Sequence, residues 1–212
     1  MSNKKIAIIA ANGNAGKLIA QEAVSRGMDV TAVVRSENRS AAQHAIVKDA
    51  FDVTAKDFAG FDAVVCAFGA WTPEAIDGIG QAIIHIGKCL EGTGVHYAVV
   101  GGAGSLYVDA EHTATVDQGP DFPDDWKPLS ASHGVGLAWL RRTTDLDWTY
   151  VSPACEFQAD GKRTGEYTLA GEELALNGVG ESTVSYADYA IAMVDLVEAG
   201  AHRRERISVV SK

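Results

Sequence analysis

The stretch that decides the fold is the apolar run Ile6-Ala7-Ile8-Ile9-Ala10-Ala11, followed directly by Asn12-Gly13-Asn14-Ala15-Gly16. An unbroken apolar run of this length predicts a strand that is buried on both faces. Residues Lys17 to Arg26 then place their apolar side chains on one side of a helix, and Gly27 is a suitable stop. The opening therefore predicts a strand, a glycine-rich turn and a helix in direct succession.

The same alternation continues along the chain. Apolar, β-rich runs recur at 30–34, 45–47, 61–68, 96–100, 148–151 and 207–210, and helical periods at 74–90, 130–142 and 187–199. Buried strands separated by helices predict a single α/β domain over residues 1–212, with a doubly wound, mostly parallel sheet of the Rossmann type. Two segments without a period, 101–129 and 153–186, are expected as loops at the carboxyl edge of the sheet, the second forming a small substrate-side region.

The glycine-rich turn resembles the G-x-G-x-x-G fingerprint of dinucleotide-binding proteins. Gly13 and Gly16 fill its second and third positions, while the first is Ala11, or Ala10 in a variant that is one residue longer. A helix N-terminus offers free N–H groups and a partial positive charge to a phosphate. The turn is therefore predicted to bind a pyrophosphate through Ala11, Asn12, Gly13, Asn14, Ala15 and Gly16. An ordinary structural turn is the alternative.

A basic residue ends the second predicted strand. Chains that bind NAD usually carry an acid about 20 residues after the glycines, where it contacts the ribose hydroxyl. Here Arg35 stands nineteen residues after Gly16, and Arg39 follows it. An arginine at this place suits the additional 2′-phosphate of NADP. The pattern favours NADP(H) over NAD(H) as cofactor, and a solvated surface arginine is the alternative.

Several further segments carry a resemblance to a known family. They are Val30–Arg35, Gly101–Leu106, Asp147–Ala154, Arg163–Tyr167 and Asp188-Tyr189-Ala190, taken together with the turn at 12–16. In this order they resemble an atypical short-chain dehydrogenase/reductase of the NADH-flavin reductase type, and they are similar to biliverdin reductase B and to NmrA-like proteins. The resemblance covers nearly the whole chain and implies a Rossmann fold with a nicotinamide cofactor.

The resemblance also implies positions along the cofactor. Ala67, Phe68 and Gly69 would line its ribose and nicotinamide side, and the nicotinamide would lie between two further segments, Gly101-Gly102 and Pro153-Ala154. It implies transfer of a hydride from the nicotinamide to a flavin (FMN or FAD) or to a similar flat acceptor such as a quinone. Two alternatives stay open, which are a non-catalytic NADP(H)-binding redox sensor and an NAD(P)-dependent epimerase or dehydratase.

The catalytic pair of typical short-chain dehydrogenases is missing. None of the six tyrosines is followed four residues later by lysine, and the helix that would carry the pair has His133 or Gly134 at the lysine position. This argues against alcohol dehydrogenase and epimerase chemistry, which needs a tyrosine of lowered pKa. Flavin reduction depends instead on stacking the rings at the right distance. Ser105 is a candidate donor beside the acceptor, with a turn cap as the alternative. His133 is a candidate proton donor or stacking surface, with a polar helix start as the alternative.

Two possible roles are open for several other side chains. Trp71, Trp126 and Tyr107 are candidates for the wall of an aromatic-ligand pocket or for ordinary packing. Arg163 is a candidate substrate contact, together with Tyr167, or a partner in a surface ion pair.

Composition excludes several classes of protein. The 212 residues carry a net charge of −10, which disfavours nucleic acid and anionic membranes as partners and leaves a small molecule. No run of 18 apolar residues is present, and three widely spaced cysteines fit a reducing cytoplasm. The histidines lack the spacing of a metal site. The sequence does not indicate an oligomeric state.

Overall fold

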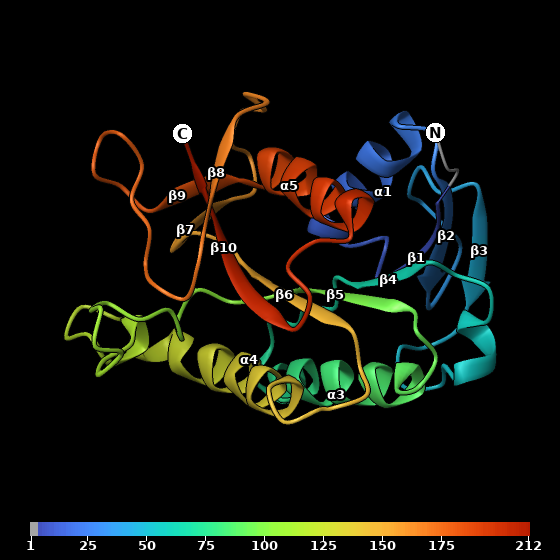
Figure 1. The fold of residues 1–212 in the computed structure, drawn as a ribbon, viewed down its shortest axis with the longest axis horizontal. Coiled ribbons are helices and arrows are strands. Elements are labelled where there is room, and N and C mark those ends of the chain that lie inside the picture. The colour runs from blue at the N-terminus through green and yellow to red at the C-terminus, as the bar shows by residue number, and fades with distance from the viewer. Residues whose placement is uncertain (1–3) are drawn as a thin grey trace.

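The computed structural model describes residues 4–212, and its centre is one large twisted sheet (Figure 1). The strands stand in the order β3-β2-β1-β4-β5-β6-β10-β8. All neighbours are parallel except β8, which is antiparallel to β10. The first six positions have the strand order of doubly wound dinucleotide-binding folds, which confirms the predicted class. The strand bounds are β1 (Lys5–Ile9), β2 (Asp29–Val34), β3 (His44–Val47), β4 (Ala63–Cys66), β5 (His96–Val100), β6 (Trp148–Ser152), β8 (Tyr167–Ala170) and β10 (Glu205–Ser211).

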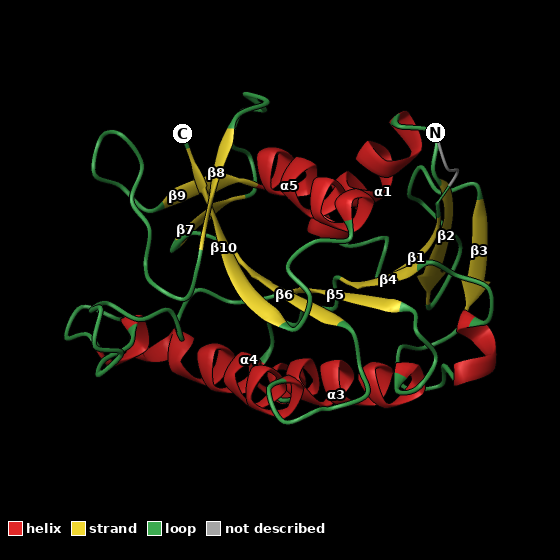
Figure 2. Ribbon diagram, in the orientation of Figure 1, coloured by secondary structure: helices red, strands yellow, loops and turns green. Residues whose placement is uncertain are grey.

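Helices cover both faces of this sheet (Figure 2). In the view of Figure 1, α1 (Asn14–Ser25) and α5 (Tyr186–Ala199) lie above the sheet, while α3 (Gly78–Leu90) and α4 (Lys127–Leu140) lie below it. Within each pair the two helices pack against each other. Each pair also packs on one face of the sheet, so that a hydrophobic core lies on either side of the strands. Because the strands are buried on both faces, they read as continuous apolar runs, which is why the sequence predicted most of them.

The predicted helix at 74–90 is interrupted. The structure has a short α2 (Pro73–Ile76) and then α3, which begins at Gly78. The Ser132 hydroxyl of α4 accepts from the Gly80 N–H at 3.0 Å and donates to the Ile76 carbonyl at 2.8 Å. These two backbone groups would be partners in an unbroken helix, so a side chain from another element has entered the ladder and broken it. The prediction of one continuous helix was wrong for this reason.

The two long segments differ in character. Residues 101–126 are irregular as predicted, with short 3-10 turns at Val116–Gln118 and Asp124–Trp126 (another lies at Ala55–Phe58). The last three residues of the predicted loop, 127–129, are instead the first turn of α4. The segment 153–186 contains three strands that were not predicted, namely β7 (Glu156–Gln158), β8 and β9 (Thr183–Ser185). β7 and β9 form a separate two-stranded sheet, and β8 extends the main sheet. A loop alone was therefore the wrong description of 153–186.

The strand register sets the place of the functional site. β1 runs beside β4, β4 beside β5 and β5 beside β6, all in parallel. The chain therefore leaves these four strands at one edge of the sheet. The glycine-rich turn at 10–16, the segment 67–71 and the two long segments all begin there, at the edge where doubly wound sheets bind ligands.

Candidate active site

The glycine-rich turn is built by close contacts of its own backbone. Ala10 has a positive φ of 58°, and its carbonyl accepts from the Gly13 N–H at 2.8 Å. A Cβ added at Gly16 would lie 2.5 Å from the Ala10 carbonyl oxygen and 2.9 Å from the Ala11 Cα. Gly16 is therefore required for the helix to pack on the strand. Ala10, in the left-handed region, occupies the place of the missing first glycine.

The first turn of α1 is open to a ligand. Gly13 is the N-cap and offers no side-chain acceptor, and the first turn has no acidic residue. Because the ladder starts with the Lys17 N–H bonding to the Gly13 carbonyl, the N–H groups of residues 14–16 lack helical partners. Asn14 and Ala15 begin a helix whose dipole favours an anion. Ala11 is fully buried in the core and contributes backbone only.

Asn12 fastens the loop that follows β2 to this turn. Its side-chain amide donates to the Glu37 carbonyl at 2.9 Å, and its carbonyl oxygen accepts from the Arg39 N–H at 2.7 Å. Arg35 and Arg39 are both exposed. Within residues 4–212, neither guanidinium has a hydrogen bond or an ion pair with another side chain. The turn, its free N–H groups and these two cations fit a phosphorylated dinucleotide.

The segment after β4 divides between core and cavity. The Ala67 N–H bonds to the Ile9 carbonyl at 3.2 Å, so this backbone continues beside the glycine turn. The Phe68 ring packs edge-on against Phe51, with ring centroids 5.8 Å apart, and is not part of the cavity wall. Gly69 does line the cavity. Gly69 therefore lies at the cavity wall, whereas the Phe68 side chain packs against the core.

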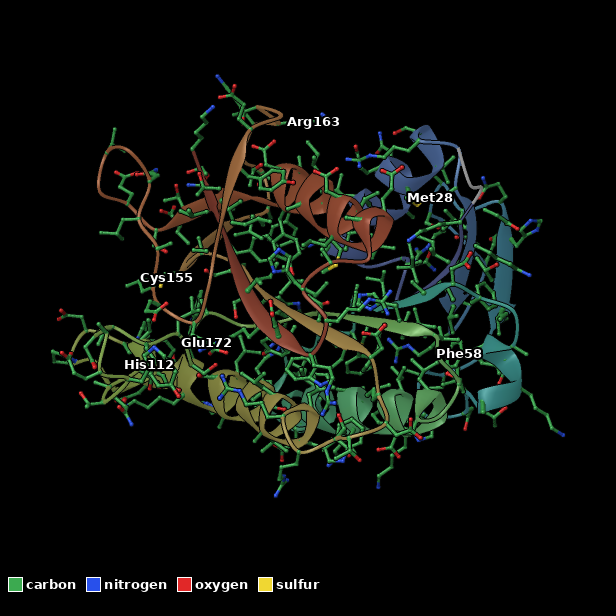
Figure 3. All side chains as sticks on the ribbon, in the orientation of Figure 1. Met28, Phe58, His112, Cys155, Arg163 and Glu172 are labelled. Atoms are coloured by element: carbon green, nitrogen blue, oxygen red, sulfur yellow. The ribbon has the colours of Figure 1, made fainter. Side chains whose placement is uncertain are left out.

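A cavity of about 540 Å³ opens at the same edge. Its walls combine the ends of β4, β5 and β6 with the two long segments, and they include the four residues expected beside a nicotinamide, Gly101, Gly102, Pro153 and Ala154. In Figure 3, Cys155 marks the cavity on the left of the molecule, between the start of α4 and the small β7–β9 sheet. Most of the lining is apolar or aromatic, which is typical of a site for a small ligand.

Two glycines of this wall are required by their neighbours. A Cβ on Gly101 would lie 2.3 Å from the ring of Tyr150, and one on Gly102 would lie 3.1 Å from the ring of His133. The Gly102 N–H donates to the Tyr150 hydroxyl oxygen at 3.0 Å, and this oxygen lies 3.2 Å from His133 Nδ1. The backbone, a phenol and an imidazole therefore form one chain of hydrogen bonds.

This chain fixes the state of His133. Burial lowers the pKa of the imidazole to about 4, so the ring is neutral at neutral pH. Burial also raises the pKa of the Tyr150 phenol far above its usual range, so the phenol keeps its proton. Among the described residues the Tyr150 hydroxyl has no other acceptor within hydrogen-bond distance, so we assign its proton to the bond with His133 Nδ1. The remaining proton of His133 then resides on Nε2, on a residue that lines the cavity.

Ser105 is not part of the cavity wall. Nη1 of Arg206 donates to its carbonyl at 2.8 Å and to its hydroxyl at 3.1 Å. Arg206 is buried, and its Nε donates to the Glu172 carboxylate at 2.6 Å. The structure thus places the Ser105 hydroxyl against a buried ion pair. Its role as a donor beside the acceptor stays a prediction from sequence position.

The other candidate side chains separate into two groups. Trp71 and Trp126 line the cavity. Tyr107 instead stacks on His112 with ring centroids 4.0 Å apart, outside the cavity wall. Arg163, at the top of Figure 3, pairs with Glu22 of α1 at 2.7 Å, so it forms an ion pair, although with a different acid from those near it in sequence.

Sequence reasoning missed much of the cavity wall. The residues missed lie in the irregular segment before α4, in the first turn of α4 or in the region after β6: Val116, Gly119, Pro120, Phe122, Leu129, Cys155, Phe157 and Tyr186. The available signal was the density of aromatic and proline residues at 120–126 in a stretch without a period. Ser130, near the expected tyrosine position, donates to Asp117 at 2.6 Å and supports this segment.

Within residues 4–212, no three His, Cys, Asp or Glu side chains gather as metal ligands do. In the same part of the chain, no helix combines the length and apolar character needed to cross a bilayer.

Comparison with known proteins adds the family. A family model described as NAD(P)H-binding matches residues 10–199. The Bacillus subtilis protein YwnB is 42% identical over 212 residues, which cover 98% of this chain and 99% of that protein. A Streptococcus pneumoniae crystal structure called a "putative NADH-flavin reductase" has a TM-score of 0.96 and 50% identity, covering 99% of this chain and all of that one. A Bacteroides thetaiotaomicron structure called a "putative epimerase" has a TM-score of 0.83 and 33% identity, covering 99% and 98% of the two chains.

Proposed function

Because the chain belongs to the NAD(P)H-binding family, we propose that it is an NADPH-dependent reductase that passes a hydride to a flat acceptor, a flavin or a quinone. The family and the Rossmann fold confirm the resemblance to atypical short-chain dehydrogenases. Support for the acceptor comes from the cavity, and support for the 2′-phosphate comes from Arg35 and Arg39. A small-molecule acceptor also agrees with the acidic charge of the chain.

The observation that carries the proposal is the neutral His133 at the wall of an aromatic cavity. When bound, the cofactor supplies a hydride, that is, two electrons and one proton. The acceptor that receives it becomes an anion and takes a further proton from water. A neutral imidazole holds its Nε2 proton firmly, so His133 acts by donating a hydrogen bond to the developing charge rather than by releasing the proton. Tyr150 is a positioning residue, because it sets the tautomer of His133.

The remaining residues hold the two reactants. The free N–H groups at 14–16 face the pyrophosphate, and Arg35 takes the 2′-phosphate with Arg39 beside it. Gly101 and Gly102 let the backbone approach the nicotinamide, opposite Pro153 and Ala154. The same sites would serve a sensor without turnover, but a hydrogen-bond donor on a residue of the cavity wall favours catalysis.

Two matched substitutions of His133 test this role. A glutamine amide extends about as far as Nε2 and keeps a donor toward the cavity, whereas an asparagine amide extends about as far as Nδ1 and loses that donor. We expect His133→Asn to lower kcat with riboflavin or a two-ring quinone about 100-fold, as loss of one such donor does. His133→Gln should retain most of the rate. NADPH oxidation is followed at the nicotinamide absorbance band.

Three results would count against the proposal. Absence of turnover with every flavin and quinone, under saturating NADPH and NADH, would remove the reductase activity. Distinct affinities for NADP⁺ and NADPH without turnover would indicate the redox sensor. Equal rates for His133→Asn, His133→Gln and the unmodified protein would remove the role of His133 while leaving the activity.

A further inference from the structure

The acceptor cavity has an uneven distribution of charge. Among the residues that line it, Asp121 is the single one with a charged side chain, because His133 is neutral and no lysine or arginine contributes. The walls are instead aromatic, formed by Trp71, Phe122, Trp126, Phe157 and Tyr186. A ligand in this cavity is therefore offered stacking surface and one negative charge.

The segment that forms the outer wall adds to this negative charge. Between residues 105 and 126 the chain has six acids and no lysine or arginine, and the acids are Asp109, Glu111, Asp117, Asp121, Asp124 and Asp125. Lys127 follows, but its ammonium group pairs with Asp124 at 2.6 Å. The mouth of the cavity thus has a negative potential, which acts on charged ligands over about 10 Å at moderate ionic strength.

The other cations near this segment do not line the cavity, and two of them share one carboxylate. Arg206 has no exposed side-chain surface and is bound to Glu172. Arg141 pairs with the same carboxylate at 2.6 Å. A phosphate group on the acceptor would therefore find no free cation in the wall, would lose part of its hydration, and would approach Asp121. Arg35 and Arg39, which have no such partners, lie instead beside the glycine turn.

Two exposed tryptophans indicate the shape of the acceptor. Trp71 is 71% exposed and Trp126 is 53% exposed, although both line the cavity. Large aromatic side chains left this open in the wall of a cavity provide area for stacking against a flat ring. These two walls come from separate segments, Trp71 after β4 and Trp126 just before α4.

Building on the proposed reductase activity, we propose that the cavity selects an uncharged flat acceptor, of the riboflavin or quinone class, and discriminates against a phosphorylated flavin such as FMN. The protein thereby separates two tasks. The cations beside the glycine turn receive the phosphates of the cofactor, and the acidic, aromatic cavity receives a neutral ring. Selection rests on the missing counter-charge rather than on a steric block.

Riboflavin and FMN provide a direct test, since they share the reacting ring and differ by one phosphate. With NADPH at low ionic strength, we expect kcat/KM for riboflavin to exceed that for FMN at least tenfold. The ratio should fall as salt is added, because screening weakens the repulsion. Quenching of tryptophan fluorescence in the presence of NADP⁺ gives the two dissociation constants independently of turnover, and they should differ in the same direction.

A charge reversal with a matched control assigns the effect to the cavity. Asp121→Lys should improve FMN relative to riboflavin about tenfold, both in kcat/KM and in binding. Glu91→Lys makes the same change of charge on an exposed residue just after α3, at the opposite edge of the sheet, and should leave the ratio unchanged. Equal effects of the two variants would show a general charge effect and overturn the assignment to the cavity.

The inference and the proposed function fail in different ways. If FMN turns over as well as riboflavin or better, selection against the phosphate is wrong, while the reductase activity stands. If no acceptor turns over, the activity is wrong, and the binding titration still decides the inference. Equal or tighter binding of FMN in that titration would overturn it.

Discussion

The two regions proposed to bind the cofactor and the acceptor offer different groups to a ligand. The turn region, residues 10–16 and 35–39, offers backbone N–H groups and two exposed cations to a ligand. The cavity region, formed by 69–71, 101–133 and 153–157, offers aromatic rings and a neutral histidine held by a tyrosine. The turn region is short and local in sequence, whereas the cavity region is assembled from distant segments. This difference determines how each responds to substitution.

The largest effect is expected where the turn region has no room. Gly16→Ala places a methyl group 2.5 Å from the Ala10 carbonyl oxygen, and both nearest neighbours are backbone atoms that cannot rotate away. We expect the free energy of unfolding to fall by about 3 kcal/mol, at the upper end of the cost of overpacking. Cofactor affinity should fall with it, because the free N–H groups move. Urea unfolding and a cofactor titration measure the two effects.

Gly134, in α4 next to the cavity region, is the matched control. A Cβ there meets nothing within 4 Å, and the position lies inside a helix. Gly134→Ala should therefore raise the free energy of unfolding by up to about 1 kcal/mol. If both variants were as stable as the unmodified protein, the contact between Gly16 and Ala10 would not be what shapes the turn.

The next effect concerns the charge that distinguishes the two regions. Arg35→Ala removes an exposed guanidinium that is proposed to bind the 2′-phosphate, and we expect NADPH affinity to fall about 30-fold, equivalent to about 2 kcal/mol. NADH carries no such phosphate, so its affinity should change little. Calorimetric titration with both cofactors measures the difference. A parallel loss of NADH affinity would show that Arg35 supports the turn generally and would remove its role in selecting NADP(H).

Sequence reasoning succeeded best in the turn region because its determinants are local. A buried strand, a turn with Gly13 and the sterically required Gly16, and a helix follow one another within residues 5–25, so period and composition suffice. Even there, the positive φ of Ala10 was not predicted, because alanine carries no signal for the left-handed region.

The cavity region depends on pairs that are far apart in sequence. The Ser132 hydroxyl, which interrupts the helix near Asp77, accepts from the Gly80 N–H, 52 residues earlier in the sequence. The Arg206 guanidinium donates to the Ser105 hydroxyl, 101 residues earlier. His133 was identified as a candidate, but its hydrogen bond to Tyr150 of β6 was not predicted. Strands β7 and β9 have three residues each, too few for a period to appear.

A smaller effect is expected from pH in the cavity region. Burial lowers the pKa of His133 from 6.5 to about 4, so the unfolded chain binds this proton more readily than the folded protein. The stabilisation is complete above about pH 6.5 and is lost as the pH falls toward 4, with a slope of at most about 1.4 kcal/mol per pH unit. His133→Gln lacks this titration and should lose less stability between pH 7 and pH 5. Urea unfolding at the two pH values decides, and an identical loss would mean that folding does not lower the pKa of His133.

The smallest effect returns to the turn region and has the opposite sign. Ala10 has a φ of 58°, a conformation that costs an alanine about 1 kcal/mol and a glycine almost nothing. Ala10→Gly removes this strain but makes the unfolded chain more flexible, so we expect a net gain of about 0.5 kcal/mol in the free energy of unfolding. Ala131→Gly, on the exposed side of α4, has no strain to relieve and should lose about 1 kcal/mol. Cofactor affinity should be unchanged in both, since the free N–H groups of α1 stay in place. A loss of stability in Ala10→Gly would mean that the methyl group of Ala10 contributes more through packing than its backbone conformation costs.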